Sequence, residues 1–148
     1  MLVQAPFFLY SQQKNINMNT TAIDAVFTPE ALQQLFPSER SNEFFDALFG
    51  DADEGAYDIE LAYTGTDGKC LNLELRLHER PGRCLVCSLT QGLPQVFARH
   101  PIINVAGMVE SIDKMLAGLA RCREWSLGRT EQRRKNMHLI PLTIQLDL

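Results

Sequence analysis

The chain has 148 residues, which suits one domain able to bury about two thirds of the surface that its unfolded form exposes. Hydrophobic residues make up 45% of it and charged residues 22%, proportions typical of globular proteins. The net charge of −4 and the pI near 5.3 argue against nucleic acid or an anionic membrane as the main partner, since both require a cationic surface.

No apolar run reaches the roughly 20 residues that span a bilayer, so we expect no membrane partner. The first ten residues are apolar but lack a basic segment and a small-residue cleavage site, which argues against a secretory signal. The four cysteines do not have the spacing of a disulfide framework. We therefore expect a cytoplasmic protein with reduced thiols.

Residues 1–22 are predicted to form a mobile N-terminal arm, and residues 23–148 a single α+β domain. Ser11 to Thr21 is polar, rich in Asn and without periodicity. Met18 could be an alternative translation start, which would make the first seventeen residues dispensable. The alternative is that Phe7, Phe8 and Leu9 dock on a neighbour, because three exposed apolar side chains would lower solubility.

Two helices are predicted next. Thr28-Pro29-Glu30 has the residues of a helix start, with Thr28 as the N-cap. A second helix is expected from about Ser41 to Phe49, ended by Gly50. The side chains expected to face the core from these helices are Ala31, Leu32, Leu35, Phe36, Phe44, Phe45, Leu48 and Phe49.

Residues 56–90 predict three antiparallel strands, because apolar and polar residues alternate with a period of two. The apolar positions are Tyr57, Ile59, Leu61 and Tyr63, then Leu71, Leu73, Leu75 and Leu77, then Leu85, Cys87 and Leu89. Thr66-Asp67-Gly68 and Pro81-Gly82 are the expected turns. An odd-length loop or a bulge at Gly82 would place the third strand in register with the second.

The rest of the chain predicts a short helical turn at 93–97, a long amphipathic helix from about Asn104 to Trp125, and a loop from Arg129 to Asn136. Residues 142–148 alternate as a final strand, which Pro141 places at a sheet edge or beside a bulge. The predicted fold is α+β: an antiparallel sheet, formed by a three-stranded meander and the C-terminal strand, with helices on one face.

Cys84-Leu-Val-Cys87 matches the C-x-x-C pattern of redox and metal sites. In a strand, however, residues three apart point to opposite faces, so the two sulfurs would diverge. We therefore interpret the pair as ordinary strand cysteines. Cys70, His78 and Cys84 would share the polar face and form a candidate metal or thiol site. The alternative, three unrelated residues on a wet or partner-covered surface, is favoured because a fourth zinc ligand is missing.

Two groups of charged residues are candidate binding sites. Glu74, Arg76 and His78 lie on the polar side of the second predicted strand, beside Glu60, where alternating charges more often serve solvation and cross-strand pairing. Arg133 and Arg134 belong to the basic run before Asn136, a predicted solvated loop that could contact an acidic partner.

Three segments resemble a small group of uncharacterised bacterial proteins, a resemblance that implies no activity; they are Phe45-Asp-Ala-Leu-Phe-Gly-Asp51 with Gly55 to Ile59, Arg80-Pro-Gly-Arg-Cys84, and Gly92-Leu-Pro-Gln-Val-Phe97. The predicted organisation is also similar to that of type III secretion chaperones, which are small acidic dimers with an N-terminal helix, a three-stranded meander and a long helix. That family usually continues with two strands and a terminal helix, whereas this chain ends in one strand.

No familiar catalytic motif or phosphate-binding loop is present, and no cofactor is expected. We therefore predict a noncatalytic cytoplasmic interaction or adaptor module that forms a homodimer or binds another protein. The prediction rests on two features. One is an exposed edge strand near the C-terminus, and the other is a set of apolar residues outside the predicted core: Phe7, Phe8, Val86, Ile102 and Ile103. The alternative is a small thiol- or metal-dependent enzyme that uses Cys70, His78, Cys84 and Cys87.

Overall fold

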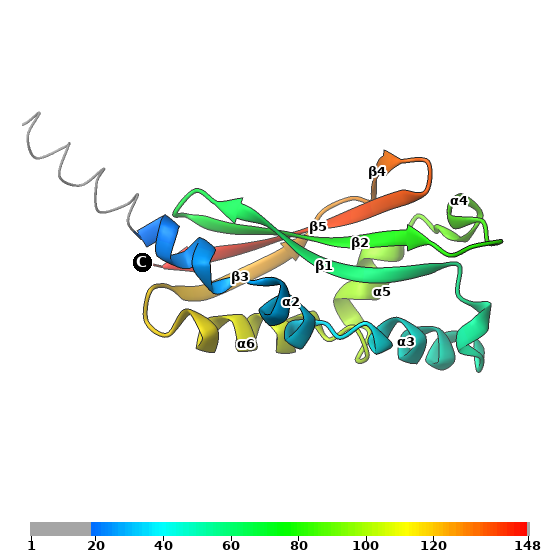
Figure 1. Cartoon of the computed structure of the whole chain (residues 1–148), viewed down its shortest axis with the longest axis horizontal. Coiled ribbons are helices and arrows are strands. Elements are labelled where there is room, and N and C mark those ends of the chain that lie inside the picture. Colours follow the sequence, from blue (N-terminus) through cyan, green and yellow to red (C-terminus); the bar gives the residue numbers. More distant parts are fainter. Residues whose placement is uncertain (1–18, 148) are drawn as a thin grey trace, which may run out of the picture.

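The structure, a computed structural model, describes residues 19–147 (Figure 1). Residues 19–26 are helical and precede the numbered elements. In chain order these are α2 (Pro29–Leu35), α3 (Glu39–Phe49), the 3₁₀ helix η1 (Ala52–Glu54), β1 (Tyr57–Thr66), β2 (Cys70–Glu79), α4 (Leu85–Ser88), α5 (Leu93–Arg99), α6 (Val105–Leu116), β3 (Arg121–Leu127), β4 (Glu131–Arg134) and β5 (Met137–Asp147).

One antiparallel sheet has the strand order β1-β2-β5-β3, with the short β4 also paired to β5. Helices α2, α3, α5 and α6 lie on one side of it (Figure 1). The predicted α+β class, with an antiparallel sheet and helices on one face, is therefore confirmed.

The alternation predicted for the first two strands is also confirmed. In β1 the residues from Tyr57 to Leu61 alternate between buried and exposed, and their buried side chains face the helices. All four leucines of β2 are at most 1% exposed. Leu75 pairs with Leu61 on one side and with Ile140 on the other, so the same face of three strands forms one core.

The predicted third strand is wrong. Leu85–Ser88 forms the short helix α4, and the strand beside β2 is β5. The run from Leu85 to Leu89 is too short for its periodicity to distinguish a strand from a helix. Local contacts favour the turn: Arg83 N–H donates to the Arg80 carbonyl across Pro81-Gly82, and Gly82 has a φ of +74°, which glycine adopts without a steric penalty.

β5 lies inside the sheet, so the predicted C-terminal edge strand is wrong as well. Pro141 is tolerated there because the partner strand on one side is interrupted between β3 and β4. Its carbonyl accepts from Gly128 N–H at 2.8 Å, just after β3 ends, and its ring nitrogen faces the same interruption. Pro141 has no N–H to return this bond to Gly128, but Gly128 lies just beyond the end of β3, so the paired length of β3 is not interrupted.

The long helix predicted from Asn104 to Trp125 is too long. α6 ends at Leu116, Ala117 adopts a left-handed conformation with a φ of 49°, and Trp125 lies in β3. Ala117-Gly118 therefore ends the helix. The predicted loop from Arg129 to Asn136 contains β4, which hydrogen-bonds to β5 although all four of its residues are exposed.

The predicted helix start at Thr28 and the predicted helix end at Gly50 are confirmed. Thr28 Oγ1 accepts from Ala31 N–H at 3.1 Å at the start of α2, and Gly50 ends α3 in a left-handed conformation. Phe44 and Phe45 are buried as predicted, but the inward placement of Leu48 and Phe49 is wrong, since these are 45% and 59% exposed.

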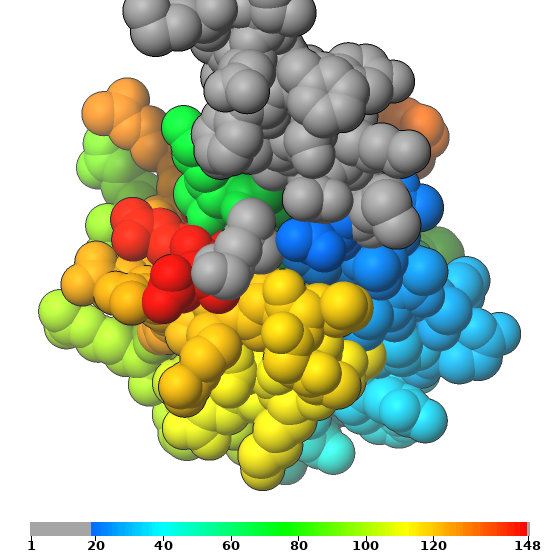
Figure 2. Space-filling model, turned by 90° about the vertical axis from the view of Figure 1, so that its left-hand side faces the viewer, coloured from blue at the N-terminus to red at the C-terminus, as the bar shows by residue number. Residues whose placement is uncertain are grey.

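Of the predicted N-terminal arm, residues 19–22 are helical, and Ile23 just after them is fully buried. The predictions for Phe7, Phe8, Leu9 and Met18 lie outside the described residues. Figure 2 shows the end of the molecule where this segment and α2 (blue) lie beside α6 (yellow), near the last residues of β5 (red).

Gly55 offers a test of the packing between η1 and α3. A Cβ on Gly55 would lie 2.3 Å from the Phe45 ring, which is 3% exposed and packs edge-on against Tyr57. We expect Gly55→Ala to lower the free energy of unfolding by about 1–3 kcal/mol in urea titrations, because a buried ring must move. The control is Gly92→Ala, where a Cβ meets nothing within 4 Å. Equal stabilities for the two variants would contradict this packing.

Candidate functional site

The sheet face opposite the core helices carries a three-residue ion pair cluster. The Glu74 carboxylate accepts from Arg76 Nε at 2.9 Å and from Arg133 Nη2 at 2.9 Å. The Glu74 side chain is only 11% exposed. Three of the predicted binding residues therefore meet here, and Arg133 does so by reaching from β4 across β5 to β2. Arg134, also predicted, is exposed on β4 and takes no part in the cluster.

Glu60 and His78 extend the cluster toward β1. Glu60 Oε1 lies 3.3 Å from His78 Nε2 and 4.0 Å from Arg76 Nη1. These side chains are substantially exposed, so their pairing contributes little to stability. The Glu74 carboxylate is already engaged by two guanidinium groups, which makes it a poor general base. This arrangement fits cross-strand pairing better than acid–base catalysis.

The predicted metal or thiol set does not assemble. Cys70 begins β2 and His78 lies near its other end, about 26 Å away at the rise of a strand. Cys84 lies beyond the turn that follows β2. Within residues 19–147 no group of three His, Cys, Asp or Glu residues could hold a metal ion.

Cys84 and Cys87 instead form a disulfide, with Cα atoms 5.4 Å apart. The interpretation of these residues as separate strand cysteines, and the expectation of reduced thiols, are wrong for this pair. Because α4 replaces the predicted strand, the backbone turns and brings the two sulfurs together. Both residues are exposed, whereas Leu85 between them is fully buried. Cys70 and Cys122 are free and half-buried.

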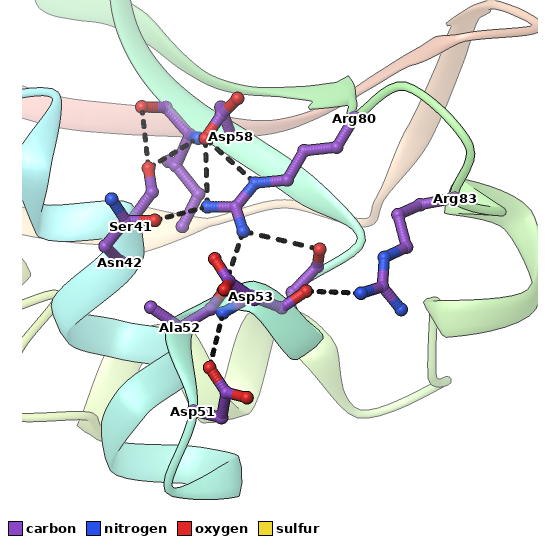
Figure 3. A network of polar contacts seen from close by, with 10 residues as sticks. Ser41, Asn42, Asp51, Ala52, Asp53, Asp58, Arg80 and Arg83 are labelled. Carbon is purple, nitrogen blue, oxygen red and sulfur yellow. Dashed lines mark hydrogen bonds and ion pairs between the residues drawn. The ribbon is translucent and has the colours of Figure 1, made fainter.

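Arg80 connects the segment that carries the disulfide to the rest of the fold (Figure 3). Its guanidinium donates to the Ala52 carbonyl at 2.8 Å and to Asn42 Oδ1 at 2.8 Å, and it pairs with Asp58 at 3.0 Å. It also lies 5.3 Å from the centre of the Phe45 ring. We call these contacts the Arg80 network: they join α3, η1, β1 and the end of β2.

Two further contacts hold the chain between β2 and α4. Arg83 Nη2 donates to the Asp53 carbonyl in η1 (Figure 3). Glu79 Oε2 accepts from Leu85 N–H at 3.0 Å, which replaces a hydrogen bond that a continuing strand would have made. The chain is therefore fixed immediately before and immediately after Cys84.

β1 forms one edge of the sheet, and α3 closes part of that edge. Ser41 Oγ accepts from Ile59 N–H at 2.8 Å and donates to the Ile59 carbonyl at 3.4 Å. Since alternate residues of a strand face the same edge, the N–H and C=O groups of Leu61 and Tyr63 also face outward. Among the described residues no strand pairs with this edge.

A groove of about 800 Å³ runs along the same edge. α2 contributes one wall, including Leu32 and Phe36, and β1 contributes residues 58–63. Arg76 and His78 line its far side, so two predicted binding residues border it. Ser41 and Arg80 are not among the predicted site residues, yet Ser41 binds the β1 edge and Arg80 binds η1 and α3. The turn Arg80-Pro-Gly-Arg83 was recognised, but nothing in the sequence shows where its arginines reach.

No protein-family model, curated protein or solved structure matches the chain, so its function has to be argued from these sites alone. Within residues 19–147 no helix has the length and apolar character needed to cross a membrane.

The Glu74 cluster gives a matched test, because adjacent arginines of β4 differ in their contacts. Arg133→Ala removes a charge-assisted hydrogen bond from the buried Glu74 carboxylate, and we expect it to lower the free energy of unfolding by about 1 kcal/mol. We expect Arg134→Ala to change it by less than about 0.5 kcal/mol. Urea titrations of both variants test this, and a larger loss for Arg134→Ala would contradict the assignment.

Proposed function

We propose that the protein is a noncatalytic interaction module, and that the edge of β1 pairs with the same edge of a second copy of the chain. The observation that carries the proposal is the edge at Leu61 and Tyr63, with which no strand pairs among residues 19–147. A strand edge with outward N–H and C=O groups is a common route for adding a strand from another chain. A two-fold axis satisfies both copies at once.

The register follows from the residues that face outward. If the axis passes at Ala62, Leu61 of one copy lies opposite Tyr63 of the other, and each of these two pairs exchanges two hydrogen bonds. Pairing ends on one side at Ile59, whose outward groups are already bonded to Ser41. On the other side it ends at the irregularity between Tyr63 and Gly65. The interface strand is therefore short and has only one favourable register.

Side chains on the polar face support this register. Glu60 of one copy lies opposite Thr64 of the other, so the acidic residues of the two edges do not meet directly. Ala62 lies opposite itself, where strands approach to about 4.5 Å between Cα atoms, and its methyl group fits this spacing without a clash. The groove beside β1 leaves space for the incoming strand.

The cellular location and the kind of partner are also part of the proposal. We propose a cytoplasmic location, since the acidic, ordinary globular composition favours it. Of the apolar residues used to predict an interaction surface, Val86 is 56% exposed, whereas Ile103 is fully buried and Ile102 is half-buried. Binding of another protein as an adaptor would use the same edge in the monomer.

A charge at the two-fold axis tests the interface. We expect Ala62→Lys to raise the dimer dissociation constant at least about tenfold, because two ammonium groups would lie opposite each other. Asn72→Lys is the control for charge, because it adds the same charge at an exposed position of β2 away from the edge. Ala62 is 8% exposed, so urea titrations of both variants measure any loss of monomer stability separately from the loss of dimer. Sedimentation equilibrium over a concentration series measures both dissociation constants. A native chain that is monomeric throughout, or equal weakening by the two variants, would contradict the proposal.

Amide hydrogen exchange provides a residue-level check. In the dimer we expect slow exchange of the Leu61 and Tyr63 amides, and dilution to the monomer should accelerate both. The Ile59 amide should stay protected in both states because Ser41 accepts from it. Exchange at Leu61 and Tyr63 that does not depend on protein concentration would exclude this edge as the interface.

A further inference from the structure

The Cys84–Cys87 disulfide lies on a part of the surface that the proposed dimer does not use. Both cysteines are exposed, and Val86 beside them is 56% exposed. The backbone is nonetheless held in place: Leu85 is fully buried, and its N–H donates to Glu79 at 3.0 Å. Ser88 Oγ donates to the Cys84 carbonyl at 3.0 Å. The pair is therefore presented to solvent on a fixed turn.

A structural role explains this disulfide poorly. A cross-link stabilises a fold mainly by restricting the unfolded chain, and the effect decreases with the length of the closed loop. Here the loop runs only from Cys84 to Cys87, and α4 already orders the residues within it. Buried Leu85 and the Arg80 network fix the segment without the sulfurs. In a cytoplasmic protein, moreover, a disulfide is more often transient than structural.

We propose that Cys84 and Cys87 form a reversible thiol–disulfide exchange site whose reaction partner is a dithiol, such as a pair of cysteines in another protein. A thiolate of the partner attacks Cys87 Sγ, the Cys84–Cys87 bond breaks, and its electron pair goes to Cys84 Sγ. The second partner thiolate then attacks the partner's own sulfur in the mixed disulfide and releases Cys87. The chain gains two electrons and two protons, and the partner dithiol becomes a disulfide.

The direction of bond cleavage follows from the contacts of the two sulfurs. Cys87 N–H donates to Cys84 Sγ at 3.2 Å, so negative charge is better stabilised on Cys84 than on Cys87. Cys84 is therefore the better leaving group in reduction, and in the reduced protein it is the more reactive thiolate.

Neither free cysteine can replace the external partner. Cys70 lies at the opposite end of β2 from the segment that carries the disulfide. For Cys122, burial and then the nearby Asp113 raise the pKa of the thiol to about 11, so it stays protonated at neutral pH. Exchange at Cys84–Cys87 therefore requires a second molecule.

The first experiment follows exchange in the full chain carrying Cys70→Ser and Cys122→Ser, with dithiothreitol as the dithiol. Samples are acid-quenched, labelled with maleimide and counted by mass. We expect both thiols to appear together under native conditions, an unchanged circular dichroism spectrum, and full reoxidation by oxidised glutathione. A disulfide that is reduced only after unfolding in urea, or a pair that oxidised glutathione leaves as thiols, would overturn the proposal.

The second experiment tests the asymmetry between the sulfurs. In the same background, Cys87→Ser leaves Cys84 as the sole thiol, and Cys84→Ser leaves Cys87. We expect iodoacetamide to alkylate Cys84 at least about tenfold faster than Cys87 at pH 7. Equal rates, or a faster Cys87, would overturn the assignment of Cys84 as the reactive sulfur. Neither experiment depends on the dimer, so failure of the β1 interface leaves both results interpretable.

Discussion

The contacts of the Arg80 guanidinium are the interactions on which the packing of α3, η1 and the segment after β2 depends. The guanidinium hydrogen-bonds to α3 and η1, pairs with β1 and lies over a buried aromatic ring, although it belongs to the residue directly after β2. Its side chain is 15% exposed, so these contacts form in partial isolation from water, where charge-assisted hydrogen bonds are stronger. Three consequences follow: η1 is held under β1, α3 is close enough for Ser41 to reach Ile59, and the chain turns away from the sheet instead of continuing as a strand.

The two proposed sites are both products of that constraint. At the β1 edge, Ser41 hydrogen-bonds to the backbone N–H and C=O of Ile59, whereas no such contact occupies the backbone groups of Leu61 and Tyr63. α3 therefore limits where a second strand can pair. After β2, the turn held by Arg80 and Arg83 leads to a segment whose buried residue, Leu85, fixes two exposed cysteines. One site uses backbone hydrogen bonds and the other uses sulfur chemistry, and they lie on different elements.

The sequence was sufficient for the elements whose patterns are long and regular. The ten-residue strands β1 and β2 alternate over most of their length, and Thr28-Pro29 and Gly50 mark helix ends through local chemistry alone. For the segment after β2, the same kind of pattern predicts the wrong structure. Leu85, Cys87 and Leu89 alternate like a strand, but the conformation is decided by Glu79, Arg80 and Arg83, whose partners are distant in sequence or depend on the turn itself. For the same reason Glu74, Arg76 and His78 were identified as one polar face, while the contact from Arg133 required the unpredicted strand β4.

Hydrogen exchange measured by mass spectrometry on Arg80→Ala tests the role of this guanidinium most directly. The account predicts faster exchange in peptides covering residues 50–56 and 80–90, with unchanged exchange in the central strand β5, because only the segments joined by the Arg80 network lose contacts. Arg83→Ala, which removes a single contact to η1, should show the same pattern with a smaller amplitude. Unchanged exchange near η1 and α4, or a uniform increase throughout the sheet, would contradict the account.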